Sequence, residues 1–130
     1  DALGKLRKLV PHVRLVQVVH VENASAEAEA LAIAPLVDFL LLDSGRTDAA
    51  VPELGGTGRV HDWSISRRIA KQSRTPVFVA GGLTPGNVGE AIGFVQPYGV
   101  DVCNGVRTDG ALDPDKLTAF LAAVEAATRR

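Results

Sequence analysis

Cysteine and methionine are nearly missing from this sequence of 130 residues, which contains one Cys and no Met. A single thiol, Cys103, excludes an internal disulfide framework and a metal site built from several cysteines. It also suits a reducing compartment, and we expect a cytoplasmic location. Because even an initiator methionine is absent, we expect the chain to be processed or to be a piece of a longer protein.

An excess of one charge and long apolar runs are missing too. The 14 Lys and Arg balance 15 Asp and Glu, for a formal net charge of -1, and the sequence has no basic block. This balance offers no electrostatic footprint for nucleic acid or for a membrane surface, so we expect neither as a partner. No apolar run reaches the roughly 20 residues of a membrane helix. With 46% hydrophobic residues, residues 1–130 have enough apolar side chains for one globular domain.

Strand-like apolar runs alternate with helix-like periodic stretches along the whole sequence. The pattern predicts an α/β fold, with strands at 13–19, 37–42, 76–80 and 99–103. A helix tail at 3–10 precedes them, and further helices begin at Asn23 or Ser25, at Asp62 or Ser64, at Thr84 and at Asp113. Two parallel-sheet architectures fit these βα units: an open flavodoxin-like sheet, or about half of a (β/α)₈ (TIM) barrel, since a full barrel takes roughly 200 residues or more.

Polar residues and glycines gather where the predicted strands end. They are His20, Asp43, Gly81 with Gly82, and Asn104 with Gly105. In both architectures the loops at the carboxyl ends of the strands carry the ligand. The segment 81–87 joins a strand to a helix that Thr84 opens, where backbone N–H groups and the helix dipole favour an anion such as phosphate. The alternative is that these glycines only form tight βα turns.

Four side chains each have a chemical and a structural interpretation. Asp43 ends an apolar strand, where partial desolvation suits a carboxyl group to general acid work; otherwise it is a cap. His20 is a polar wall of the pocket or a capped surface histidine. Asp101 lies inside the fourth predicted strand, where we expect a structural hydrogen-bonding role. Cys103 is expected to be a small core residue rather than a nucleophile.

Four motifs in one order give the sequence a resemblance to a known family. They are Leu41-Leu42-Asp43-Ser44, Gly55-Gly56-Thr57-Gly58 with Asp62-Trp63, the segment 80–88, and the segment 98–102 with Gly105-Val106. In this order they closely resemble phosphoribosylanthranilate isomerase, a (β/α)₈ barrel of tryptophan biosynthesis. The resemblance covers nearly the whole chain and corresponds to strands five to eight of that barrel, its C-terminal half.

The resemblance implies an Amadori rearrangement of N-(5-phosphoribosyl)anthranilate to a ring-opened aminoketose, without a metal or a cofactor. In the family, the aspartate that ends strand six is the general acid that protonates the furanose oxygen, and it corresponds to Asp43. The residues that correspond to the substrate and phosphate contacts are Gly56, Thr57, Gly81, Gly82, Asn104 and Gly105. The implied ligand is a small phosphorylated substrate.

Other features of the family are absent or changed in this sequence. The family's general base is a cysteine in a Lys-Ile-Cys-Gly segment on strand one, and an arginine from the second loop contacts the anthranilate carboxylate. These 130 residues contain neither segment. We therefore expect no turnover from this chain alone, and association with the N-terminal half barrel or as a homodimer. Cys103, Asn104, Arg107 and His61 also depart from the family pattern, which leaves the exact substrate open.

Two other functions stay as alternatives. A non-catalytic phosphate-binding half barrel that self-associates would use the same glycine loops. An independent flavodoxin-like domain would bind a nucleotide or act in signalling. The Gly-Gly-Thr-Gly loop at 55–58 and the lack of an acidic cluster after the first strand oppose the flavodoxin-like domain.

Overall fold

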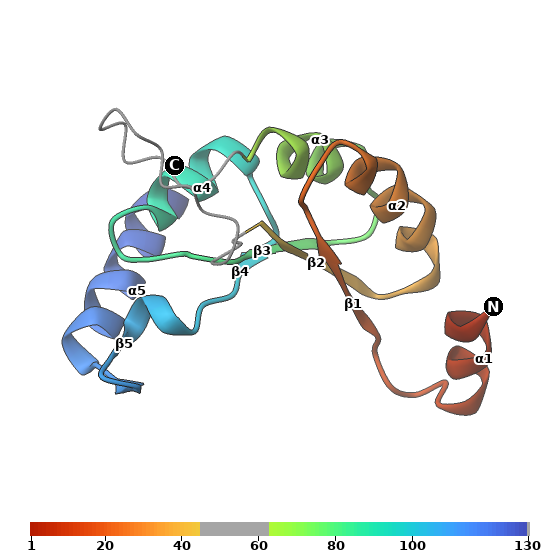
Figure 1. Ribbon diagram of the computed structural model, residues 1–130, viewed down its shortest axis with the longest axis horizontal. Helices are drawn as coiled ribbons and strands as arrows, with labels where there is room; N and C mark the ends of the chain where they lie inside the picture. The colour runs from red at the N-terminus through yellow and green to blue at the C-terminus, as the bar shows by residue number, and fades with distance from the viewer. Residues whose placement is uncertain (45–62, 130) are drawn as a thin grey trace.

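Four parallel strands form the main sheet of the computed structural model, which describes residues 1–44 and 63–129. The strands are β1 (Val16–His20), β2 (Phe39–Asp43), β3 (Val77–Ala80) and β4 (Gly99–Val100). Each strand is hydrogen-bonded to the next one along the chain, in the order β1-β2-β3-β4 (Figure 1). A flavodoxin-like sheet has an order that doubles back, such as 2-1-3-4-5. The flavodoxin-like alternative is therefore wrong, and the order is that of a barrel wall.

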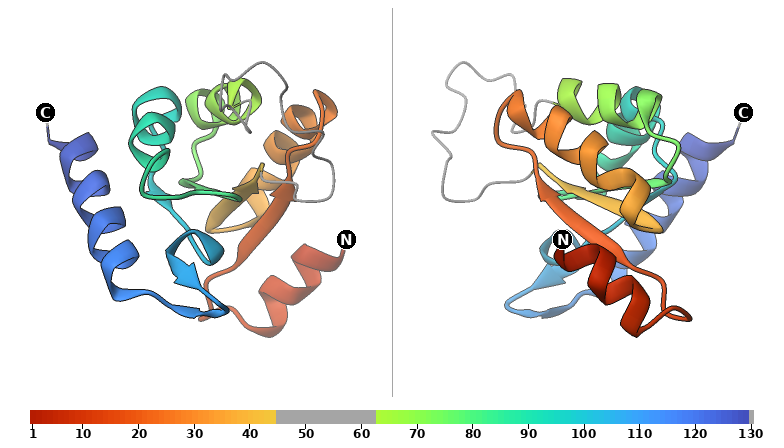
Figure 2. Two further views of the ribbon diagram at one scale, coloured as in Figure 1. Left: turned by 60° about the vertical axis from the view of Figure 1, so that its left-hand side comes forward. Right: turned by 90° about the vertical axis from the view of Figure 1, so that its right-hand side faces the viewer.

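Four of the described helices follow the strands and form a layer: α2 (Ser25–Ile33), α3 (Ser64–Gln72), α4 (Val88–Val95) and α5 (Pro114–Thr128). Another helix, α1 (Ala2–Leu9), precedes β1 and lies apart from this layer (Figure 1). Two 3₁₀ turns, η1 (Ala34–Leu36) and η2 (Asn104–Val106), and an antiparallel hairpin of β5 (Arg107–Thr108) and β6 (Ala111–Leu112) complete the fold. Figure 2 shows α2 to α5 along one side of the sheet, and successive helices pack against one another. Within the described residues, no helix is long and apolar enough to cross a bilayer.

The last helix, α5, begins where the sequence predicts. Asp113 is its N-cap, and the carboxylate accepts hydrogen bonds from the backbone N–H groups of Asp115 and Lys116. The spacing of Leu117, Phe120, Leu121 and Val124 predicts one apolar stripe on this helix. Phe120 is buried, but Leu121 is 57% exposed. One residue along a helix turns the side chain by about 100°, which carries Leu121 off the buried face.

Helix α4 begins later than predicted, at Val88 instead of Thr84. The turn that leads into α4 is nevertheless organised around Thr84. Val88 N donates to Thr84 O at 3.0 Å, an α-type hydrogen bond. The side chain of Asn87 bonds back to the loop after β3: its Oδ1 accepts a hydrogen bond from Thr84 N at 2.8 Å, and its Nδ2 donates to Gly82 O at 3.0 Å. The bond to Thr84 N is like that of a capping box, in which the third helical residue bonds back to the N-cap N–H.

The core lies between the sheet and the helical layer. Five strand side chains that face the helices are at most 3% exposed: Val19, Leu40, Leu42, Val77 and Val79. The helical residues that are buried with them include Ala26, Ala30, Ile69, Val88, Ala91 and Val95. Trp63 is 3% exposed and belongs to the same core. Burial of such side chains is the main force that holds the helices on this face.

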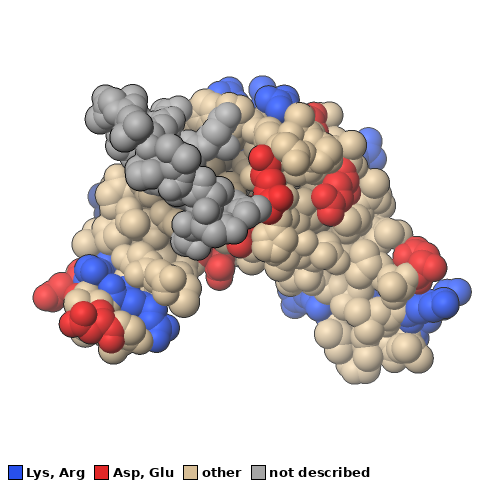
Figure 3. Space-filling model, in the orientation of Figure 1, with Lys and Arg blue, Asp and Glu red and all other residues tan. Residues whose placement is uncertain are grey.

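The opposite face of the sheet, which we call the concave face, is apolar and partly open to solvent. Because side chains alternate along a strand, it carries Val16, Val18, Phe39, Leu41 and Phe78. Val16 is 53% exposed and Val18 is 42% exposed. Figure 3 shows the molecule as an arch with a hollow between its α1 and α5 ends, and on this side Lys and Arg gather mainly at those two ends. No helical layer covers the concave face within residues 1–44 and 63–129.

Three aromatic rings cluster on the concave face near the amino ends of the strands. The ring centroids of Phe39, Phe78 and Tyr98 lie 5.5 to 5.8 Å from one another. Phe78 lies over Gly99, where an added Cβ would come within 2.5 Å of the ring. The glycine is needed here because any larger residue would push Phe78 out of this cluster.

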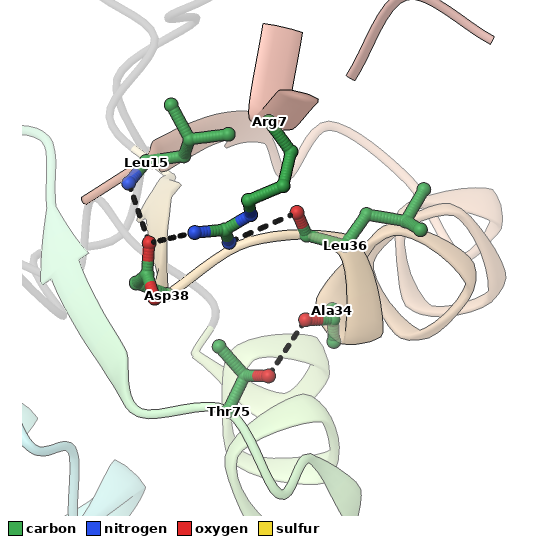
Figure 4. A network of polar contacts seen from close by, with 6 residues as sticks. All are labelled: Arg7, Leu15, Ala34, Leu36, Asp38 and Thr75. Atoms are coloured by element: carbon green, nitrogen blue, oxygen red, sulfur yellow. Dashed lines mark hydrogen bonds and ion pairs between the residues drawn. The ribbon is translucent and has the colours of Figure 1, made fainter. Parts of the chain in front are cut away.

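A polar network joins α1 to the start of β2. The Oδ2 atom of Asp38 accepts hydrogen bonds from Leu15 N at 2.7 Å and from Arg7 Nη1 at 3.0 Å (Figure 4). Arg7 Nη2 also donates to Leu36 O at 3.3 Å. The Leu15 N–H group, with the Arg7 guanidinium, holds the pKa of Asp38 below its ordinary value.

Replacing Asp38 with Asn is expected to lower the free energy of unfolding near neutral pH, by an amount that shrinks in acid. A carboxyl group whose pKa is lowered by folding stabilises the folded state. This contribution is complete at pH values above the unfolded pKa of about 3.9, and it is lost as the pH falls through the pKa of the folded state. Urea unfolding of both chains at about pH 6 and about pH 3 measures the effect. An equal difference at both pH values would contradict the role given to the Asp38 charge.

Candidate active site

The carboxyl ends of the strands meet along one edge of the sheet. The parallel register pairs His20 with Asp43 and Asp43 with Ala80. Two backbone hydrogen bonds continue this register beyond the strands: Val21 N donates to Asp43 O at 2.9 Å, and Ser44 N donates to Ala80 O at 3.1 Å. Side chains two residues apart share a face, so Asp43 and His20 lie on the concave side of the sheet.

A cavity of about 410 Å³ opens at this edge, within the range of about 300 to 1,000 Å³ that is typical of small-molecule sites. Its described lining is Val18, Leu41, Asp43, Ala80, the segment 81–83 after β3 and the segment 101–105 after β4. Five predicted site residues lie on it together: Asp43, Gly81, Gly82, Asn104 and Gly105. Gly56, Thr57 and His61 lie outside the described residues.

The turn after β3 depends on two glycines. Gly81 has φ 94° and Gly82 has φ 66°, values that other residues rarely adopt. Turns of this kind expose successive backbone N–H groups, and such concave arrangements are suited to anions. The turn lies on the wall of the cavity, so an anion bound there would share the cavity with Asp43.

The turn after β3 and the 3₁₀ turn η2 touch directly through Gly105. A Cβ atom at Gly105 would lie 1.8 Å from the carbonyl oxygen of Leu83 and 3.1 Å from Thr84 Cα. No side chain fits between these two backbones. The structure thus brings together the two glycine segments that the sequence predicts to face one point.

Replacing Gly105 with Ala is expected to push η2 away from Leu83 and to lower the free energy of unfolding by about 1 to 3 kcal/mol, as overpacking does. Gly89 in α4 is a matched control, because an added Cβ there meets nothing within 4 Å. Gly89→Ala should raise stability by roughly 0.5 to 1 kcal/mol through helix propensity. Urea unfolding of both variants measures the two changes, and a harmless Gly105→Ala would contradict the tight contact.

His20 lies beside Asp43 rather than on the wall of the cavity. Its Nδ1 atom is 3.8 Å from Asp43 Oδ2, and the two side chains are 66% and 33% exposed. His20 is not among the described residues that line the cavity, which favours its interpretation as a surface histidine over that of a polar wall. The contact becomes an ion pair when the imidazole is protonated.

The strand β4 is shorter than the predicted 99–103, and this changes two interpretations. Asp101 N still donates to Val79 O at 2.9 Å, but the chain then turns into η2. Asp101 is therefore exposed beyond the strand, where water solvates its charge, and not the buried structural residue that we expected. Cys103 is also exposed instead of belonging to the core, and both residues line the cavity.

Val18 and Leu41 belong to the cavity, although the sequence did not single them out as site residues. The available signal was their position two residues before His20 and Asp43, which places them on the same face of the sheet. Within residues 1–44 and 63–129, no three His, Cys, Asp or Glu side chains are grouped so that they could hold a metal ion.

A parallel sheet that winds in one direction, with helices on one face and a cavity at its carboxyl edge, defines a chain of the (β/α)-barrel type. A sequence model of N-(5'phosphoribosyl)anthranilate (PRA) isomerase matches residues 4–123. The chain belongs to this family.

Relatives and solved structures agree with this family. N-(5'-phosphoribosyl)anthranilate isomerase 2 of Methanosarcina mazei is 42% identical over 122 residues, which are 93% of this chain and 53% of the relative. The phosphoribosyl anthranilate isomerase of Thermococcus kodakaraensis is 38% identical with a TM-score of 0.71, over 95% of this chain and 57% of that chain. A phosphoribosyl anthranilate isomerase in complex with reduced 1-(o-carboxyphenylamino)-1-deoxyribulose 5-phosphate is 27% identical with a TM-score of 0.72, over 93% and 53% of the two chains. The chain spans about half the length of the curated relatives it matches.

Proposed function

We propose that this chain is the C-terminal half of a phosphoribosylanthranilate isomerase barrel, and that it catalyses the Amadori rearrangement of N-(5-phosphoribosyl)anthranilate together with the N-terminal half. The observation that carries the proposal is the single cavity shared by Asp43 and the glycine turns after β3 and β4. A phosphorylated ribosyl substrate needs a site for its phosphate and a general acid near its ring oxygen. The two must therefore lie no farther apart than the length of the substrate. The solved family structure that holds a deoxyribulose 5-phosphate compound supports the same ligand class.

In this proposal, each half of the described cavity has its own task. Asp43 donates its proton to the furanose oxygen, which opens the ring as the C–O bond breaks. The backbone N–H groups at Gly81, Gly82 and Gly105 hold the phosphate, with Asn104 beside them. Gly56 and Thr57 complete the substrate contacts by their resemblance to the family. The reaction uses no metal and no cofactor, and we place it in the cytoplasm.

The changes from the family pattern after β4 fall partly outside the cavity. Cys103 and Asn104 line it, at positions where the family has two serines, so they alter its wall. Arg107 stands where the family has Glu, but it is not among the described residues of the lining. Its guanidinium donates to Gly110 O inside the β5–β6 hairpin and lies 4.0 Å from Cys103 Sγ. The cavity wall at Cys103 and Asn104 is therefore the place where specificity would differ from that of the family.

The partner in this proposal is the N-terminal half barrel. The concave face supports it, because inward side chains of a closed barrel form a shared core, and here Val16 and Val18 are exposed. A homodimer of this chain would cover the same face. The alternative function, a non-catalytic phosphate-binding half barrel, is favoured only if such a homodimer forms and binds phosphate without turnover.

The test mixes the 130-residue chain with the N-terminal half of the Methanosarcina mazei relative and follows conversion of N-(5-phosphoribosyl)anthranilate. We expect no turnover from either half and measurable turnover from the mixture, because the family's base and acid lie on different halves. A mixture that associates without turnover would contradict the proposed function. Turnover by this chain alone, lost in Cys103→Ser, would show that Cys103 supplies the base.

A further inference from the structure

The position of His20 next to Asp43 is a feature that the proposed chemistry does not use. His20 is the last residue of β1, and Asp43 is the last residue of β2. Their register pairing and the hydrogen bond from Val21 N to Asp43 O at 2.9 Å hold the two backbones side by side. The Nδ1–Oδ2 distance of 3.8 Å exceeds a hydrogen bond of about 2.7 to 3.2 Å by less than one ångström. A small side-chain rotation therefore closes the contact.

We propose that His20 is a positioning residue that returns a proton to Asp43 after each turnover. This inference rests on the proposed function, in which Asp43 gives its proton to the furanose oxygen and is left as a carboxylate. The imidazolium then transfers its Nδ1 proton to Asp43 Oδ2, which leaves a neutral imidazole and a carboxylic acid. The imidazole takes a new proton from solvent or from a buffer acid, so protons and charge balance over the cycle.

The exposure of the two side chains suits this relay. Asp43 is 33% exposed and lines the cavity, where a bound substrate limits its contact with water. His20 is 66% exposed and lies outside the described lining, so solvent reaches its ring while the cavity is filled. Imidazole is also the side chain that exchanges protons most readily near neutral pH.

The other titratable groups around His20 are mostly carboxylates. Asp43 and Asp101 line the cavity with Cys103, and Glu22 follows His20 two residues along the chain. On α2, which packs against β1, Glu27 is bound to Arg68 at 2.8 Å. An ionised carboxylate accepts protons and has none to donate. Cys103 follows β4, with β3 between it and Asp43. Within residues 1–44 and 63–129, we assign His20 as the donor to Asp43, because its Nδ1 atom lies 3.8 Å from the Asp43 Oδ2 atom.

The test uses the assembly of this chain with the N-terminal half of the Methanosarcina mazei relative. In His20→Ala we expect kcat to fall by roughly 10-fold, below the 10²- to 10⁴-fold effect of a direct proton donor, with KM unchanged. The rate of this variant should rise with the concentration of imidazole buffer, because an external acid then supplies the proton. His12→Ala is the matched control, since His12 is an exposed histidine between α1 and β1. Its kcat should not change and should not depend on buffer.

The outcomes separate this inference from the proposed function. Buffer-dependent recovery of kcat in His20→Ala alone supports the relay. An unchanged kcat in that variant, or a loss that no buffer restores, contradicts the relay while the proposed function stands. An assembly that is inactive with His20 in place contradicts the proposed function and the relay with it.

Discussion

An Asp43→Asn variant of the assembled barrel is expected to lose about 10²- to 10⁴-fold in kcat. Asn has nearly the same shape as Asp but has no proton to give to the furanose oxygen. The side chain is 33% exposed at the open edge of the sheet, so the free energy of unfolding should change little. Steady-state kinetics and urea unfolding of the same preparation measure both quantities.

The matched control is Asp38, which lies at the other end of the same strand. Asp38 precedes β2 and binds Leu15 N and Arg7, whereas Asp43 ends β2 and lines the cavity. Asp38→Asn should therefore lower stability and leave kcat near normal, the reverse of Asp43→Asn. Near-normal turnover in a folded Asp43→Asn assembly would show that Asp43 is not the acid.

The strands of this fold could be predicted because their apolar runs are distinct. The prediction of 76–80 differs from the observed β3, Val77–Ala80, by one residue. The prediction of 37–42 differs from β2, Phe39–Asp43, by two residues at most. Both strands are short and bounded by polar or turn-forming residues, so local composition defines them. The choice between barrel wall and open sheet needed the pairing order, which depends on contacts far apart in the sequence.

The predicted end of the fourth strand was wrong because of a tertiary contact. Val102 and Cys103 extend the apolar pattern past Asp101, but the strand ends at Val100 and the chain then turns into η2. The closeness of η2 to Leu83 requires Gly105, and no local pattern shows that contact. Helix α4 begins at Val88, four residues after Thr84, although Thr84 O accepts an α-type hydrogen bond from Val88 N at 3.0 Å.

The sequence predicted which residues belong to the candidate site better than it predicted the contacts between them. Residues after parallel strands collect at one edge by geometry, which places Asp43 and the glycines 81, 82 and 105 around one cavity. The contact between His20 and Asp43 depends on which residues pair across β1 and β2. The sequence of one strand does not show which residues of the neighbouring strand it pairs with. Val18 and Leu41 differ from this case, because alternation along each strand already places them on the face of His20 and Asp43.

The second large effect concerns association of this chain. In solution without another half barrel, the 130-residue chain is expected to form dimers or larger species at micromolar concentration. Among the described residues, β1 and β4 are the outer strands of the sheet, and exposed strand edges favour pairing. The concave face adds exposed Val16 and Val18 and the ring cluster of Phe39, Phe78 and Tyr98. Light scattering measures the molar mass directly.

Two substitutions test whether the concave face drives this association. Val16→Glu places a charge on β1, where the side chain is 53% exposed on that face, and should shift the chain toward monomer. Phe94→Glu is the matched control on α4, where the ring lies 4.9 Å below the Arg67 guanidinium on the helical side. It should leave the molar mass unchanged, because the helical layer is not the associating surface. A monodisperse monomer that unfolds cooperatively, observed for the unaltered chain, would contradict the prediction that the concave face requires a partner.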